Sequence, residues 1–469
     1  MTFVQWEFLV FLAVVYALYW GVPKLRFQNG MLALASCIFY GWVHPWFLVL
    51  LFASSLLDFA SGILMEDRPA RKKLWLGLSM AGNLGMLAYF KYCDFFLENV
   101  AAALTTLGIE HSVTTLGIFL PVGISFYTFQ TMSYSIDIYR GELKAERDLI
   151  DYVVFVTFFP QLVAGPVERA GNLLAQVNAP RRWSGEQQIA GVTLAMWGAF
   201  KKVCIADVIS PYVDRIFVLT DPSFALVALG AVGFSIQILA DFSGYTDIAR
   251  GVSRMLGFEL MKNFDHPYIA TEPSDFWKRW HISFSSWIRD YVYKSVGGNR
   301  GGFWAQTRNT WIAMLTSGLW HGASWNFVLW GAYHAALTTG YRVVKPRIPS
   351  AIRHARWATP AAVVLMYGFT CLGWLIFRET HLDRLVRYAT LSPFALPDDH
   401  KVAVAVFLTT ILELAAPLVV ALWVETRLWP RLKERPMALP LQTTMWAATA
   451  VAIAAFVRSN DADFIYFQF

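Results

Sequence analysis

The chain has 469 residues, of which 56% are hydrophobic and only 15% are charged. This composition excludes an ordinary soluble domain and indicates a membrane protein with several spans. The formal net charge of +6 comes largely from basic residues between apolar segments, which favours contact with lipid headgroups over a nucleic-acid surface.

Apolar segments recur along the whole sequence and set the expected architecture. They lie near 6–22, 30–43, 46–65, 74–97, 114–136, 150–166, 189–212, 224–245, 310–340, 358–377, 402–424 and 441–457. Only helices or closed barrels satisfy their backbone hydrogen bonds in lipid, and the period of two that marks barrel strands is missing. We therefore predict an all-α polytopic integral membrane protein of one domain, residues 1–469, with roughly 11–13 membrane segments.

Two segments contain proline, glycine and polar residues within otherwise apolar sequence. They are FLPVGISFYTFQTMSYSIDIYRG (119–141) and FFPQLVAGPVERAG (158–171). Such residues are tolerated at membrane depth only where protein or water covers the backbone. We expect short or re-entrant helices around a central tunnel, with ordinary kinks in a packed bundle as the alternative.

Two carboxylates, Asp241 and Asp247, lie in the apolar run ADFSGYTDIARG. Buried charges persist mainly where partners exist, so we expect structural pairing with Arg250 or Arg254 rather than a direct chemical role.

The least apolar long segment, residues 259–309, interleaves aromatic and basic residues and contains His281 in FWKRWHISFSSWIRDY. We expect it at the membrane interface, where tryptophans lie at headgroup depth and basic side chains extend toward phosphates. A surface helix that merely anchors the chain is the alternative. The run GGNRGG (297–302) could present backbone N–H groups and Arg300 to a phosphate. It lacks the ending of a nucleotide-binding loop, and a simple turn also explains it.

His321 lies in TSGLWHGASWNFVLWGAYH, far from formally charged residues. A polar residue alone in an apolar run is a functional candidate because burying it unpaired is costly. A largely neutral imidazole can take a proton from an alcohol and return it to a leaving thiolate. A core histidine hydrogen-bonded to a neighbouring helix is the structural alternative.

Two other chemistries compete for His321. Metal binding is disfavoured because no carboxylate or cysteine stands at helical spacing and only His334 follows nearby, so His281 would have to fold back. A serine nucleophile at Ser317 or Ser324 could share the helix face, but neither lies in a GxSxG sequence. We predict no metal site.

Basic loops mark the expected cytoplasmic side. The clearest contains Arg342, Lys345, Arg347, Arg353 and Arg356 without an acidic residue, and the stretch 427–435 is a second.

The run NFDHPYIATEPSDFWKRWHISFSSWIRDYVYKSVGGNRGG, followed by GLWHGASWNFVLWGAYH, closely resembles the membrane-bound O-acyltransferase family. The likeness is to its bacterial alginate O-acetylation branch, whose relatives act on cellulose, peptidoglycan or teichoic acids. Further similar runs are YFKYCDFF (89–96), LPVGISFYTFQTMSYSIDIYRGE (120–142), FPQLVAGPVER (159–169), QILADFSGYTDIARG (237–251) and FIYFQF (464–469). The resemblance covers most of the chain, and its catalytic core motifs fall within about 115–340.

The resemblance implies an O-acyltransferase that moves an acetyl group across the bilayer, with acetyl-CoA as donor substrate and no bound cofactor. His321 matches the family's catalytic histidine and is expected to be the general base. His281 matches the second characteristic histidine and could orient the donor, polarise its carbonyl or line the tunnel. Candidates for the phosphates of coenzyme A, chosen by charge and position, are Lys278, Arg279, Arg289 and Arg300.

The same resemblance implies a multi-pass protein of the bacterial inner membrane. Its acceptor would be an extracytoplasmic polysaccharide such as alginate or cellulose, reached directly or through a periplasmic acetyltransferase or a polysaccharide synthase and export complex. Membrane lipid is the other expected partner, and nucleic acid is not. The stretches 379–402 and 425–442 match no motif and are expected to contact a partner. A transporter or flippase, or a non-catalytic subunit of an export complex, are the competing functions.

Overall fold

The computed structural model describes residues 1–42, 44–162, 165–353, 355–428 and 438–456. The run FIYFQF (464–469) and most of the basic stretch 427–435 lie outside the described residues. The described part of the chain forms helices, turns and coil without a strand, which confirms the all-α prediction. The chain divides into two compact units, Met1–Ala195 with Ile248–Met261 and Met196–Asp247 with Lys262–Phe469.

Five helical segments are long and apolar enough to cross a membrane. They are Phe47–Asp67 (α3), Gly185–Phe217 (α10, a π-helical stretch and α11), Phe224–Met255 (α12), Ala358–Arg378 (α18) and Asp398–Trp423 (α20). The shortest of them has 21 residues, which at 1.5 Å per residue is about 31 Å, the thickness of a hydrocarbon core. Their number and composition confirm a polytopic membrane protein.

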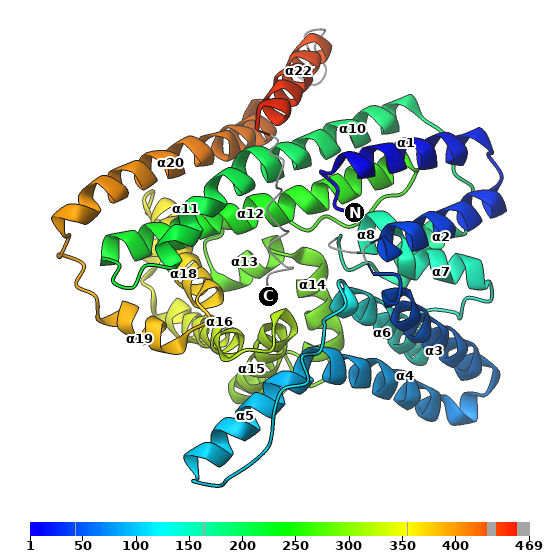
Figure 1. Ribbon diagram of the computed structural model, residues 1–469, viewed down its shortest axis with the longest axis horizontal. Helices are drawn as coiled ribbons and strands as arrows, with labels where there is room; N and C mark the ends of the chain where they lie inside the picture. The colour runs from blue at the N-terminus through cyan, green and yellow to red at the C-terminus, as the bar shows by residue number, and fades with distance from the viewer. Residues whose placement is uncertain (43, 163–164, 354, 429–437, 457–469) are drawn as a thin grey trace. The chain divides into compact units, whose positions relative to one another are not determined.

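The first unit is built around one central helix. Its elements are α1 (Trp6–Gly21), α2 (Leu25–Gly41), α3, α4 (Lys72–Leu87), α5 (Cys93–Thr106), α6 (Ile124–Arg140), α7 (Leu149–Thr157), α8 (Phe159–Leu162), α9 (Ala170–Val177) and the first part of α10 (Gly185–Phe200). Helix α6 packs against α3 and α4 (Figure 1). Most of its side chains are buried. A helix so enclosed tolerates the serines and threonines of its sequence because neighbouring helices supply hydrogen-bond partners.

A buried carboxylate joins these helices. Asp58 of α3 is fully buried, and its oxygens accept hydrogen bonds from Ser135 Oγ of α6 (2.8 Å) and Asn83 Nδ2 of α4 (2.6 Å), and from Ser79. Each donor removes part of the cost of burying the carboxyl group. These donors therefore supply the hydrogen bonds that water would otherwise give to the Asp58 carboxyl group.

The structure revises the prediction of two broken segments. Residues 124–140 form one continuous helix, α6, so the interruption expected within 119–141 lies before Ile124 and the prediction is wrong for the rest of that run. The run 158–171 is broken, as predicted, because Phe158 has φ −44° and ψ 106° between the short helices α7 and α8.

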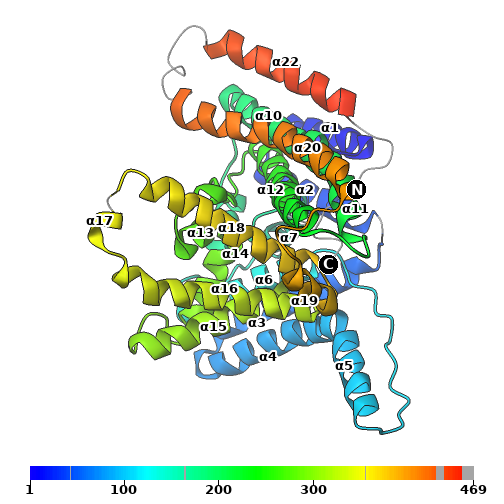
Figure 2. The ribbon, with the colours of Figure 1, turned by 90° about the vertical axis from the view of Figure 1, so that its left-hand side faces the viewer.

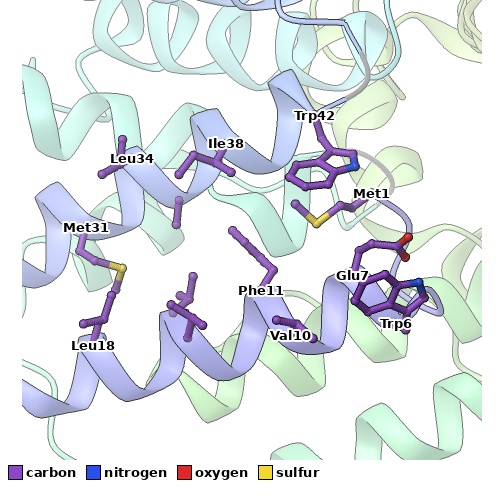
Figure 3. Close-up of a pocket in the computed structure, with 13 residues that line it drawn as sticks. Met1, Trp6, Glu7, Val10, Phe11, Leu18, Met31, Leu34, Ile38 and Trp42 are labelled. Atoms are coloured by element: carbon purple, nitrogen blue, oxygen red, sulfur yellow. The ribbon is translucent and has the colours of Figure 1, made fainter.

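The two N-terminal helices leave an apolar groove of about 570 Å³ between them. Figure 3 shows Leu34 and Ile38 of α2 facing Val10 and Phe11 of α1 across it. Trp6, at one end, is 70% exposed. Exposing such an apolar surface to water is unfavourable, and contact with the acyl chains of a bilayer would remove that cost.

The second unit contains His281, His321 and the four basic candidates. Its elements are a π-helical stretch (Lys201–Ala206), α11 (Asp207–Phe217), most of α12, α13 (Pro273–Arg279), α14 (Ile282–Trp287), a second π-helical stretch (Ile288–Tyr293), α15 (Gly302–His321), α16 (Trp325–Val344), α17 (Ser350–Arg353), α18, α19 (Leu382–Thr390), α20 and α22 (Ala438–Phe456). The predicted apolar block 310–340 is two helices, because α15 ends at His321 and α16 begins at Trp325.

Helices α15 and α16 lie side by side, and glycines set their separation (Figures 1 and 2). A Cβ atom on Gly331 would lie 2.5 Å from the carbonyl oxygen of Met314, and one on Gly318 would meet the carbonyl oxygen of Phe327. Small residues at helix contacts allow backbones to approach closely in membrane proteins. The hairpin therefore depends on the missing side chains of these two glycines.

A second buried charge network pairs α12 with the π-helical stretch 201–206. Lys201 Nζ lies 2.6 Å from Asp247 Oδ2, and Lys202 Nζ lies 3.0 Å from Asp241 Oδ1 and 2.8 Å from Asp207 Oδ1. The two carboxylates are paired, as expected, but with lysines that the sequence analysis did not consider. Arg254, one of the predicted partners, pairs with Glu259 instead (2.5 Å).

Replacement of Lys202 by Met should lower the free energy of unfolding by about 3–5 kcal/mol, because two carboxylates then lose a buried cation. Thermal unfolding in detergent would measure the loss. The matched control is Lys262→Met, whose ion pair with Asp265 is half exposed and should contribute about 0–1 kcal/mol. Equal losses of stability in the two variants would contradict the role of Lys202 as a buried cation that stabilises the fold.

A pair of alanine substitutions on α16 tests the close helix contact. Gly331→Ala should reduce the folded yield and the unfolding temperature, because its Cβ would meet the Met314 backbone. Gly340→Ala, on the same helix with nothing within 4 Å, should be neutral or stabilising by up to about 1 kcal/mol. A destabilised Gly340→Ala beside an unaffected Gly331→Ala would exclude this packing.

Candidate functional site

His321 occupies the tip of the α15–α16 hairpin. It is the last residue of α15, and Gly322, Ala323 and the N-cap Ser324 separate it from α16. A Cβ atom at Gly322 would meet the ring of Phe327, so the turn passes close to the first turn of α16. The His321 side chain is held in the interior by this turn and is only 6% exposed.

Aromatic rings surround the imidazole of His321. Its centroid lies 5.0 Å from that of Trp330, 5.2 Å from that of Phe377 and 5.6 Å from that of Phe284, each at a steep interplanar angle. Edge-to-face contacts of this kind fix the orientation of a ring as well as burying it. The arrangement keeps bulk water away from the imidazole and fixes its plane.

His281 is held in a backbone conformation that is unusual for a residue other than glycine. It caps α14 with φ 44° and ψ 54°, in the left-handed region, and is 1% exposed. A residue in this region costs on the order of 1–3 kcal/mol, and such residues persist where surrounding contacts impose them. The strain makes His281 a candidate for a functional position.

Asn263 supplies the contacts that hold His281. Its side-chain oxygen accepts hydrogen bonds from the Ser283 backbone N–H (3.2 Å) and the Ser283 hydroxyl (2.6 Å), and its backbone oxygen accepts one from Ile282 N–H (2.9 Å). The same side-chain oxygen lies 3.2 Å from His281 Nδ1. Since a backbone N–H can only donate, the atom facing Ser283 must be the amide oxygen, and Nδ1 must carry the hydrogen. Nε2 is then the nitrogen with the lone pair.

His281 is neutral under ordinary conditions. It lies outside the five long apolar helices, and burial lowers its pKa to about 3. A neutral ring with a fixed tautomer can accept a hydrogen bond at Nε2.

The two histidines contact the same pair of aromatic rings. Phe284 lies 5.0 Å from His281 and 5.6 Å from His321, while Trp320 lies 6.0 Å from His281 and 5.0 Å from His321. Phe284 and Trp320 themselves are 4.2 Å apart. Residues forty positions apart in the sequence are thus gathered around one aromatic cluster.

The four basic candidates have different surroundings. Arg279 pairs with Asp275 (2.8 Å) and Arg289 with Asp290 (3.0 Å), so both guanidinium groups already have carboxylate partners. The side chains of Lys278 and Arg300 are exposed and make no hydrogen bond or ion pair within the described ranges. A phosphate group would therefore not have to displace a carboxylate in order to pair with Lys278 or Arg300.

The glycine-rich run that contains Arg300 forms the turn before α15. Gly297 and Gly298 have φ values of 116° and 57°, which favour glycine, and Asn309 Nδ2 donates to the Gly298 carbonyl (2.9 Å). Gln306 Nε2 donates similarly to Asn299 O (2.8 Å). The loop is thereby fixed against the first turns of α15.

A third histidine extends the aromatic cluster. His334 of α16 is 2% exposed, and its ring lies 4.8 Å from Trp330, which also contacts His321, and 5.0 Å from Trp277. In the sequence, His334 stands out only as a possible metal ligand, although its spacing of four from Trp330 places both on one helix face. In the described part of the chain, no group of three His, Cys, Asp or Glu side chains could hold a metal ion.

Asn263 was also missed, although it lies in the run NFDHPY that carries part of the family resemblance. Nothing in a single sequence links this asparagine to a histidine eighteen residues later. The contact requires the chain to turn back at 264–280, which places Ile282 N–H against Asn263 O.

The membrane-bound O-acyltransferase family matches residues 142–378. The chain belongs to this family. It is 41% identical over 390 residues to the probable alginate O-acetylase of Azotobacter vinelandii, covering 82% of this chain and 76% of the relative. It is 32% identical over 392 residues to the peptidoglycan O-acetyltransferase of Helicobacter pylori (77% and 73% covered) and 30% identical over 280 residues to the teichoic acid D-alanyltransferase of Bacillus subtilis (55% and 68% covered).

These findings confirm the family predicted from the sequence and the O-acyltransferase activity that it implies. All three relatives are named as enzymes that transfer an acyl group, and their names give different acceptors. The range that matches the membrane-bound O-acyltransferases contains Asn263 and the helices α13 to α16, and therefore both histidines and the four basic candidates.

Substitution of Asn263 tests its role as a positioning residue in this O-acyltransferase. Asn263→Leu should lower kcat for acyl-donor turnover about tenfold to a hundredfold, because the tautomer and backbone of His281 lose their shared acceptor. Asn263→Asp keeps an acceptor oxygen and should retain most of kcat. Turnover kinetics and unfolding temperatures of both variants are required, since a purely structural residue would lower stability without this difference in kcat.

Proposed function

We propose that this O-acyltransferase takes an acetyl group from acetyl-CoA in the cytoplasm and uses it to O-acetylate a polysaccharide, such as alginate or cellulose, outside the bacterial inner membrane. The observation that carries the proposal is the pair of buried histidines around the rings of Phe284 and Trp320. The alginate and peptidoglycan O-acetylases among the relatives support the acetyl group and the type of acceptor.

The topology supports access from both faces. Helix α16 has 20 residues, about 30 Å, and ends at Val344 beside the basic loop 342–356, which is expected in the cytoplasm. Helix α18 leaves that loop and ends at Arg378, and Asn326 Nδ2 near the hairpin tip donates to the Phe377 carbonyl (3.0 Å). His321 therefore lies toward the outer side, where an acceptor hydroxyl approaches. The donor must enter through a tunnel from the cytoplasm.

His321 is assigned as the general base. Its imidazole removes the proton from the acceptor hydroxyl as the oxygen attacks the thioester carbonyl, and the resulting tetrahedral intermediate expels the coenzyme A thiolate. The imidazolium then protonates the thiolate, so the proton balance closes without another group. A thioester is activated enough that positioning and proton transfer supply most of the catalysis. The dry aromatic surroundings protect the thioester from hydrolysis.

Of the three roles that the sequence left open for His281, we propose only one. Its Nδ1–H is directed at Asn263, so in this tautomer it has no N–H with which to polarise the donor carbonyl. Nε2 can accept a hydrogen bond from an amide N–H of the pantetheine arm or from the acceptor hydroxyl. We therefore assign it to orienting a substrate.

The remaining assignments follow from charge and from the family. Lys278 and Arg300 are the first candidates for the phosphates of coenzyme A, and Arg279 and Arg289 could contribute by leaving their carboxylate partners. Acetyl-CoA is consumed as a substrate, and no bound cofactor is required. The acetyl group reaches the polymer directly or through a periplasmic acetyltransferase or polysaccharide export complex. Because the matched range 142–378 includes parts of both units, we treat the chain as one catalytic membrane domain.

The decisive experiment follows labelled acetyl-CoA with the purified protein in lipid. His321→Ala should lower the rate of acetyl transfer or thioester hydrolysis by at least about a hundredfold, the usual contribution of a general base. His111→Ala, on an exposed loop, is the matched control and should turn over like the wild type.

Unchanged turnover in His321→Ala would remove this histidine from the mechanism. Transport of a solute into liposomes without consumption of any acyl donor would instead support a transporter or flippase. Normal assembly of an export complex, with no effect of His321→Ala or His281→Ala on acetylation, would support a non-catalytic subunit.

A further inference from the structure

A cavity of about 510 Å³ whose lining includes neither His281 nor His321 lies between the loop that precedes α12 and the segment that runs from the end of α19 into the first turn of α20. Both parts belong to the second unit. The side chains with hydrogen-bonding groups that line it are Thr220, Asp221, Ser223, Ser392, Asp399 and His400. Its volume is suited to a small organic ring.

Two polar groups of the lining have no hydrogen-bond partner within the described residues. Ser223 is 6% exposed and its Oγ makes no hydrogen bond, and the buried His400 Nδ1 makes none either. A buried polar atom without a partner costs about 1–3 kcal/mol, so a ligand in the cavity that supplied hydrogen bonds to these two atoms would gain affinity.

Apolar and polar groups share the lining. Phe224 and Leu391 supply apolar surface, while Asp399 offers two carboxylate oxygens without an ion pair in the described part of the chain. A sugar ring has the matching surface, with hydroxyl groups at its rim and C–H groups on its faces. Carboxylate, hydroxyl and imidazole groups can each accept or exchange hydrogen bonds with the sugar hydroxyls.

Charge places this cavity on the outer face. The segment that joins α18 to α20 carries acidic and basic residues in nearly equal number, namely Glu379, Asp383, Asp398 and Asp399 with Arg384, Arg387 and Lys401. The loops at the opposite ends of these helices are the basic ones. Arg387 pairs with Asp221 (3.4 Å), and Arg384 Nη2 donates to Leu219 O (3.1 Å), so the loop before α12 lies on the same side.

We propose that this cavity binds an uncharged sugar residue of the acceptor saccharide through its hydroxyl groups. The proposal rests on the proposed function for the identity of its ligand as an acceptor. Arg387 offsets the charge of Asp221, but the Asp399 carboxylate has no such partner and would repel a uronate carboxylate. The cavity thereby favours neutral sugars over uronates, and so favours cellulose over alginate among the acceptors named above.

Binding of cellotetraose to the full chain in lipid nanodiscs tests this site, with oligomannuronate of the same length as the charged probe. Asp399→Ala should weaken cellotetraose binding about tenfold or more, through loss of hydrogen bonds to a charged acceptor. The control is Asp398→Ala, whose side chain is 93% exposed, pairs with Lys401 and does not line the cavity. It should bind cellotetraose like the wild type.

Equal cellotetraose affinity of the two alanine variants would overturn the site, as would the failure of the wild type to bind cellotetraose. Oligomannuronate binding as tight as that of cellotetraose would overturn the preference for uncharged sugars. Acetyl-CoA turnover by the wild type and His321→Ala is measured separately without saccharide. Failure of the catalytic proposal is therefore distinguishable from failure of the sugar site.

Discussion

The close approach of α15 and α16 is the contact on which the candidate site depends. Gly318 and Gly331 let each helix pass against the backbone of the other, and His321 stands at the turn that this contact closes. A wider hairpin would separate His321 from Trp330. The position of His321 is thus set by the absence of side chains at the two glycines. Lipid provides no apolar driving force between helices, so close packing must hold them together.

Several buried polar groups in the described part of this protein have hydrogen-bond or ion-pair partners supplied by other parts of the chain. Asp58 is surrounded by hydroxyl and amide donors, and Lys202 lies between two aspartates. Asn263 accepts three hydrogen bonds and holds His281 in its strained conformation. The same principle that permits charge inside a membrane protein also orients the candidate catalytic groups.

Much of the architecture was predictable because the composition of a segment and the length of its apolar run show whether a helix lies in lipid or in water. The hairpin at His321 was not separated within the block 310–340, because Gly322 to Ser324 interrupt the helices without interrupting the apolar sequence. In the segment 119–141 the polar residues predicted a break along the run. They instead lie within the continuous helix α6, where neighbouring helices surround them. Lys201 and Lys202 were overlooked because pairing partners forty residues away have no local signature.

By itself, the sequence determined the helical membrane class and the family, and it pointed to the two histidines as candidates, because these follow from composition and from motifs that are local in the chain. Tertiary structure alone decided that Phe284 and Trp320 join the two rings and that Arg279 and Arg289 already have carboxylate partners. It also decided that Asn263 selects the tautomer of His281. Distances and hydrogen-bond directions depend on how distant segments pack, and a linear sequence contains no measure of that proximity.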